Sequence, residues 1–297
     1  MRKLSGNFMK KLQGEWKNLL EYIKDDDTLD LELRGKEITV YYRGGALLSI
    51  KEENDGTYTW KPLDAEYKKG KASMPTGCIR DFENYIPQAK HVIDKYIVCS
   101  PKNHLGEKEI QQLVVKENNY SPNSNDTDFF IVDMEYQDSV GRFDLVALKW
   151  ESYTSARKSN AVSIAIIEVK QGINTVRTSE SNPGLRKHQK DFKEFCTHPT
   201  AKKSFMHDML AVFKQKCELG LIKANSKIEN INEETPLQLV GDLEFYCLLA
   251  NYKPASEQLK NELEEMDDCN FFTSSYMGYG LYANNIINKE EILKSIN

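Results

Sequence analysis

The stretch VSIAIIEVKQG, residues 162–172, decides how the second half of the chain is interpreted. Side chains two positions apart on a strand point the same way, so Glu168 and Lys170 share one face. Both faces are apolar over residues 164–167, which predicts a central strand buried on two sides. Gly172 then ends the strand. Functional sites often lie at the carboxyl ends of strands in open α/β sheets, so this strand end is the first candidate site.

Two strand-like runs precede this one, FFIVDMEY (129–136) and RFDLVALKW (142–150). If the second run pairs antiparallel with the 162–170 strand, the start of one lies beside the end of the other, and Asp144 comes close to Glu168. Two neighbouring carboxylates repel and would not both stay ionised without a cation. Lys170 could pair with one of them, whereas a divalent cation would hold both. Oxygen ligands favour Mg²⁺, with Mn²⁺ as a substitute.

Helical patterns flank the three strands. GEKEIQQLVVKEN (106–118) precedes them, and GLRKHQKDFKEF (184–195) and a helix over 201–219 follow. LEFYCLLANY (243–252) is a late strand. The order helix, strand, strand, strand, helix, strand predicts an α/β fold of the α+β type, with a mixed sheet covered by helices.

The first hundred residues have a different pattern. Residues 31–50 alternate apolar and polar side chains around Gly44-Gly45, which predicts an antiparallel meander with a tight turn. A helix is expected within 82–97. We therefore expect two parts, a β-rich accessory region over 1–100 and a core with a C-terminal extension over 101–297.

Asp144 and the later Glu168-Val169-Lys170 resemble the D…(D/E)xK signature of the PD-(D/E)xK nuclease superfamily. Members share a restriction-endonuclease-like core with the order α-β-β-β-α-β. The resemblance covers roughly residues 104–252, and Phe143 stands where the signature often has proline. It implies that Asp144 and Glu168 bind Mg²⁺, that the main-chain carbonyl of Val169 is a further ligand, and that Lys170 acts on the attacking water.

The resemblance also implies two contributions from helices. Many members supply a glutamate from the helix before the first strand; here Glu107 is the predicted catalytic residue and Glu109 the alternative. Members often carry a polar residue on the helix after the ExK strand. His188 and Gln189 occupy that helix, and Gln189 is the predicted catalytic residue.

The net charge of −5 excludes a globally basic nucleic-acid-binding protein, so positive charge for phosphates must be local. Residues 186–203 contain six basic side chains and two acidic ones. The predicted substrate-binding residues are Arg177, Arg186, Lys187, His188 and Lys190. The alternative interpretation of this segment is an exposed, solvated helix face.

These observations predict a Mg²⁺-dependent phosphodiesterase, a nuclease whose substrate is nucleic acid, with DNA favoured over RNA. The alternative is a non-catalytic nucleic-acid-binding or scaffold protein that keeps the nuclease fold; in a third interpretation the ExK triplet is a coincidence. The first residues lack the apolar core of a signal peptide, and no segment approaches the roughly 18 apolar residues of a membrane span. We therefore expect a cytoplasmic protein without a membrane partner, and a homodimer is compatible with the sequence.

Overall fold

The structure is a computed structural model, and it describes residues 2–77, 79–99, 106–137, 141–172, 175–180, 182–223, 236–251, 256–275 and 278–296. The chain forms two compact units. The first contains Met1–Gln112 and Lys214–Leu221, and the second contains Leu113–Phe213 and Ile222–Asn297. The sequence predicts a single boundary between residues 100 and 101, whereas in the structure the first unit extends to Gln112 and residues 214–221 return to it.

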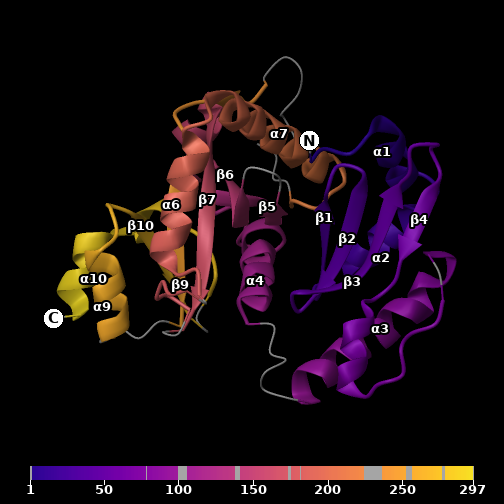
Figure 1. Ribbon diagram of the computed structural model, residues 1–297. Helices are drawn as coiled ribbons and strands as arrows, with labels where there is room; N and C mark the ends of the chain where they lie inside the picture. Colours follow the sequence, from indigo (N-terminus) through magenta and orange to yellow (C-terminus); the bar gives the residue numbers. More distant parts are fainter. Residues whose placement is uncertain are drawn as a thin grey trace. The chain divides into compact units, whose positions relative to one another are not determined.

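The first unit contains a four-stranded antiparallel sheet in the order β1-β2-β3-β4 (Figure 1). Its strands are Leu29–Leu33, Glu37–Tyr42, Gly45–Glu52 and Tyr58–Lys61. The predicted meander is therefore present. Gly44 makes the tight turn between β2 and β3 with φ +79°, and a Cβ there would lie 2.6 Å from the backbone of Glu109. Only glycine satisfies both the turn and this close approach.

Helices make the first unit mixed rather than β-rich, which differs from the sequence expectation. They are α1 (Gly6–Gln13), α2 (Lys17–Asp25), α3 (Phe82–Cys99), the first part of α4 (Glu107–Asn119) and the 3₁₀ turns Ala65–Gly70 and Ile79–Asp81. Ser5 caps α1, because its Oγ accepts a hydrogen bond from the Phe8 amide at 3.0 Å.

A buried ion pair ties the returning segment into the first unit. Lys216 Nζ lies 2.8 Å from Glu32 Oε1, and the two side chains are 1% and 0% exposed. Glu32 belongs to β1, far from Lys216 in sequence. A charge buried this completely requires a partner, so the first unit depends on residues supplied late in the chain.

The second unit is built on a sheet in the order β11-β10-β9-β7-β6-β5, with β8 beside β7. The strands are β5 (Phe129–Gln137), β6 (Arg142–Lys149), β7 (Ala161–Gln171), β8 (Gln238–Leu239), β9 (Glu244–Ala250), β10 (Asn270–Ser274) and β11 (Ile287–Asn288). β5, β6 and β7 pair antiparallel, whereas β7, β9 and β10 pair parallel. The fold is therefore mixed α/β, as the sequence predicts.

Helices α6 (Leu185–Cys196), α9 (Glu257–Glu264) and α10 (Lys289–Ile296) lie together beside β7, β9 and β10 (Figure 1). They bury one face of β9 and β10, where Leu185, Leu249, Leu263 and Phe271 belong to one apolar cluster. The unit also contains α5 (Thr154–Ser159), most of α7 (Pro199–Glu218) and the 3₁₀ turn Ala283–Asn285. Among the described residues, no helix has the length and apolar character needed to cross a membrane.

Candidate active site

Antiparallel pairing of β6 and β7 brings Asp144 to Glu168. Leu145 lies opposite Ile167 in the register, and the next position along β6 toward its start is Asp144. Asp144 Oδ2 accepts a hydrogen bond from the amide of Val169 at 2.9 Å, and the Asp144 carboxyl also hydrogen-bonds that of Glu168. The two carboxyl groups are therefore neighbours, as the alternation of residues on the two strands predicts.

Glu168 and Lys170 are buried charges at the end of an otherwise apolar strand. Lys170 Nζ lies 2.7 Å from Glu168 Oε1, and the side chains are 6% and 2% exposed. Burial raises the pKa of Glu168 well above its usual range, and the negative charge of Asp144 raises it further, although Lys170 acts in the opposite direction. One lysine thus compensates incompletely for two carboxyl groups, and the Asp144–Glu168 pair retains affinity for a proton or a cation.

His188 is the residue of α6 that contacts this pair. Its Nε2 lies 3.0 Å from Glu168 Oε1. Burial and the charge of Lys170 lower the pKa of His188 to about 4, so the ring is neutral at neutral pH. The ring also hydrogen-bonds the backbone of Pro183, which can only accept because proline has no amide hydrogen. The other ring nitrogen therefore carries the proton, and Nε2 presents a lone pair toward Glu168.

The start of α6 is fixed by contacts from outside the helix. Gly184 is its N-cap and offers no side-chain hydrogen bond. A Cβ at Gly184 would lie 2.2 Å from the amide nitrogen of Thr178, so only glycine at this position lets the backbone of Thr178 come so close. Glu262 of α9 supplies the missing acceptor, because its Oε1 accepts from the Arg186 amide and its Oε2 from the Thr178 amide, both at 2.9 Å. Sequence reasoning missed Glu262, which is distant in sequence and matches no local capping pattern.

Gln189, the predicted catalytic residue of α6, points to a different part of the unit. Its Nε2 donates to the carbonyls of Asp267 and Asp268 at 3.1 and 3.3 Å, and its Oε1 accepts from the Asp267 amide at 3.0 Å. The amide side chain thus joins α6 to the loop before β10. In this structure it is His188, rather than Gln189, that reaches Glu168.

The basic segment after residue 185 is largely neutralised by acidic partners. Ion pairs join Arg186 to Glu265, Lys187 to Asp191, Lys193 to Asp267 and Lys202 to Asp242. Arg177 and Lys190 are exposed. Arg177 and Arg186 also line a cavity of about 330 Å³ beside α9. Of the predicted substrate-binding residues, Arg186 and Lys187 therefore already have acidic partners in this structure.

Glu107 and Glu109 belong to the part of α4 that lies in the first unit. Glu109 Oε1 accepts a hydrogen bond from Arg43 Nε at 2.7 Å, and Arg43 also pairs with Asp94. Glu109 therefore has a structural role within that unit. The assignment of either glutamate to the metal stays a prediction.

The donor set around Asp144 suits a magnesium ion. No cluster of three or more His, Cys, Asp or Glu side chains arranged to hold a metal occurs in the described ranges. Mg²⁺ usually takes only one or two protein carboxylates and keeps water or substrate oxygens as its other ligands. Asp144 and Glu168 provide that number, in contact and buried at a strand end, and a second positive charge would relieve their mutual repulsion.

Comparison with protein-family models, curated proteins and solved structures found no match for this chain. The function is therefore inferred from the geometry of the site itself.

Proposed function

We propose that this protein is a metal-dependent nuclease that hydrolyses phosphodiester bonds, with DNA as the favoured substrate. The observation that carries the proposal is the contact of Asp144 with both Glu168 and the Val169 amide, beside a buried Lys170. An apolar sheet gains no stability from three adjacent ionisable groups, and such clusters are typical of catalytic sites.

The proposal includes a restriction-endonuclease-like core. Its support is the chain order α4, β5, β6, β7, α6, β9, in which β5–β7 are antiparallel and β9 adds parallel to β7. The small helix α5 between β6 and β7, and α7 after α6, are additions to that order.

Asp144 and Glu168 would hold Mg²⁺, with the carbonyl of Val169 as a further ligand. When bound, the ion would supply Lewis-acid stabilisation of charge on the scissile phosphate and a bound water of lowered pKa. Lys170 would leave its pairing with Glu168 and orient the attacking water, and its positive charge would stabilise the charge that develops on the phosphoryl oxygens. His188 contacts the Glu168 carboxyl from α6 and can accept a proton at Nε2.

A cleavage assay tests the proposal. Labelled single- and double-stranded DNA and RNA are incubated with the protein in Mg²⁺, Mn²⁺ or EDTA. We expect metal-dependent cleavage that Glu168→Gln and Lys170→Met each reduce by more than about 100-fold, because each removes a group that acts on the reacting atoms.

Glu244→Gln is the matched control, since Glu244 is also a carboxylate of this sheet paired with a lysine, Lys149 at 2.9 Å. Cleavage equal in all three variants would identify a contaminating nuclease and refute the site. Nucleic-acid binding without cleavage in any metal would favour the non-catalytic alternative.

A further inference from the structure

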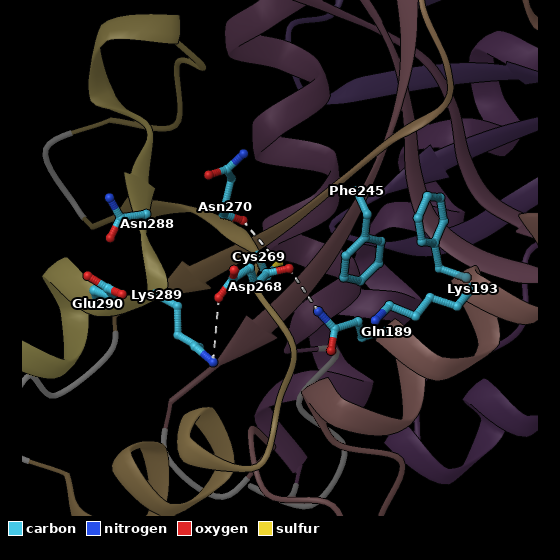
Figure 2. A pocket seen from close by; sticks show the side chains of 10 residues that line it. Gln189, Lys193, Phe245, Asp268, Cys269, Asn270, Asn288, Lys289 and Glu290 are labelled. Carbon is cyan, nitrogen blue, oxygen red and sulfur yellow. Dashed lines mark hydrogen bonds and ion pairs between the residues drawn. The ribbon is translucent and has the colours of Figure 1, made fainter.

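A cavity of about 490 Å³ lies beside α6, between that helix, the starts of β9 and β10, and the junction of β11 with α10 (Figure 2). Phe192 and Lys193 of α6 line it, with Phe245, Asn270, Asn288 and Lys289. None of these residues takes part in the site around Glu168. The cavity is large enough for a ligand of nucleotide size, whereas a bound water needs only about 30 Å³.

One wall of the cavity is aromatic. The rings of Phe192 and Phe245 are stacked with their centroids 4.9 Å apart and their planes at 26°. Both side chains are only partly buried, so the pair presents apolar ring surface to the cavity. Every nucleobase has a π-face, and stacking of a base on an aromatic side chain contributes about 1–3 kcal/mol. This wall therefore suits a flat, aromatic ligand.

The opposite side offers amide groups. Asn270 and Asn288 are directly opposed in the β10–β11 pair, so their side chains lie on the same face. Asn288 Oδ1 caps α10 by accepting from the Glu291 amide at 2.9 Å. Within the described part of the chain, the side-chain NH₂ of Asn288 and both polar groups of the Asn270 side chain have no hydrogen-bond partner. Asparagine amides match the donor and acceptor edges of nucleobases.

Two lysines and two carboxylates set the charge of the cavity. Lys193 pairs with Asp267 at the rim and is about half exposed. Lys289 Nζ lies 3.8 Å from Asp268 Oδ1 and donates to the Met266 carbonyl at 2.8 Å. Asp268 and Glu290 also line the cavity, so its lining side chains have no net charge, and Asp267 adds one negative charge at the rim. A ligand with a single phosphate fits this balance better than a polyphosphate.

We propose that this cavity binds one nucleotide, with its base on the Phe192–Phe245 wall, its edge at Asn270 and Asn288, and its phosphate between Lys193 and Lys289. The assignment deepens the proposed nuclease function and rests on it for the source of the nucleotide. Glu168 lies opposite Cys247 in the β7–β9 register, so Phe245, two residues before Cys247, lies on the same face of the sheet. Helix α6 contributes to both places, with His188 at one and Phe192 at the other.

The test is a binding titration in EDTA, so that no cleavage occurs. The probes are 2-aminopurine deoxyribonucleoside monophosphate and a single-stranded oligonucleotide with one 2-aminopurine, whose fluorescence is quenched on stacking. We expect saturable quenching, and a rise in Kd of about 5- to 50-fold for Phe192→Leu and for Asn270→Ala. Asn270 is exposed, and its side chain has no hydrogen-bond partner among the described residues, so Asn270→Ala remains informative if Phe192→Leu fails to fold.

Matched controls are Tyr153→Leu and Lys158→Ala, which alter an exposed aromatic and an exposed lysine outside the cavity. Quenching that only the cavity variants weaken supports the site. Whether the free nucleotide, the oligonucleotide or both are bound then identifies the source of the nucleotide. Absence of quenching, or equal binding by all variants, overturns it. Metal-dependent cleavage with no quenching would refute the nucleotide site and support the nuclease function. Cavity-dependent quenching without cleavage would support the nucleotide site and refute the nuclease function.

Discussion

Replacing Lys170 with methionine removes the ammonium group of a buried ion pair and keeps a long apolar stem. Nζ lies 2.7 Å from Glu168 Oε1, with the two side chains 6% and 2% exposed, so solvent cannot replace the lost partner. Breaking a buried pair in this way costs roughly 3–5 kcal/mol. Glu168 can lower that cost by taking up a proton.

Protonation sets an upper limit on the loss of stability. A carboxyl group with an unfolded-state pKa of about 4.3 requires about 4 kcal/mol to be protonated at pH 7, or about 1.4 kcal/mol for each pH unit. Since Lys170 lowers the pKa of Glu168, its removal raises that pKa further. The deficit of the variant therefore develops above the folded-state pKa that Glu168 has in the wild-type protein, and it is lost as the pH falls through that raised value. Because the pKa of Glu168 is already raised in the wild-type protein, part of this cost is present before the substitution. We expect Lys170→Met to lose less than about 4 kcal/mol of unfolding free energy at pH 7 and almost none near pH 4.

The assay is urea unfolding in EDTA at several pH values. Trp150, which is 1% exposed, reports the second unit when Trp16 and Trp60 of the first unit are replaced by phenylalanine. In the double variant K170M/E168Q, the uncharged glutamine needs no counter-charge, so most of the lost stability should return. A double variant no more stable than Lys170→Met, or a deficit independent of pH, would refute the reasoning.

Three further predictions concern residues outside this pair. Burial alone would raise the pKa of Glu244, but its hydrogen bonds, one of them from Lys149, outweigh burial and lower the pKa. The stability that ionised Glu244 contributes to the fold is therefore present above the unfolded-state pKa. It is lost as the pH falls through the lowered folded-state pKa. Glu244→Gln should cost about 1–2 kcal/mol at neutral pH in urea unfolding, and a difference that persists in acid would contradict this. Glu262→Gln should speed hydrogen exchange in the first turn of α6, because a charged acceptor is lost there; unchanged exchange would show that the carboxylate does not fix the helix. Glu107→Gln should abolish cleavage, whereas Glu109→Gln should retain it. Glu109→Gln should lower the free energy of unfolding by less than about 1 kcal/mol, since Glu109 belongs to a partly exposed ion pair. Cleavage that is lost in Glu109→Gln and kept in Glu107→Gln would exchange the roles of the two glutamates.

The positions of Asp144 and Glu168 could be predicted because they follow from the period of two along a strand and from one antiparallel pairing. The choice between His188 and Gln189 could not be. Both flank the buried side of α6, and what separates them is the neighbour that each meets, Glu168 for one and the loop at Asp267 for the other. A helical pattern in the sequence predicts which side of the helix is buried, but it does not predict which residues of other elements that side contacts.

The basic segment shows the same limit for charge. Its excess is evident in the sequence, but Glu265, Asp267 and Asp242 neutralise it from positions that only the fold brings near. The helices of residues 6–25 were within reach of sequence reasoning. Ser5 is a recognisable N-cap, and Phe8 and Leu12 have helical spacing, but the strand pattern that follows dominated the prediction.

The return of residues 214–221 to the first unit has a consequence for synthesis on the ribosome. Glu32 is made early, whereas Lys216 follows roughly 100 residues after the first part of the unit ends at Gln112. At about 5–20 residues per second, translation leaves that part waiting for about 5–20 seconds. Protease resistance of chains stalled before and after residue 221 would time its completion, and equal resistance at both points would contradict the delay. Although it begins the chain, the N-terminal unit is thus finished only after most of the second unit has been translated.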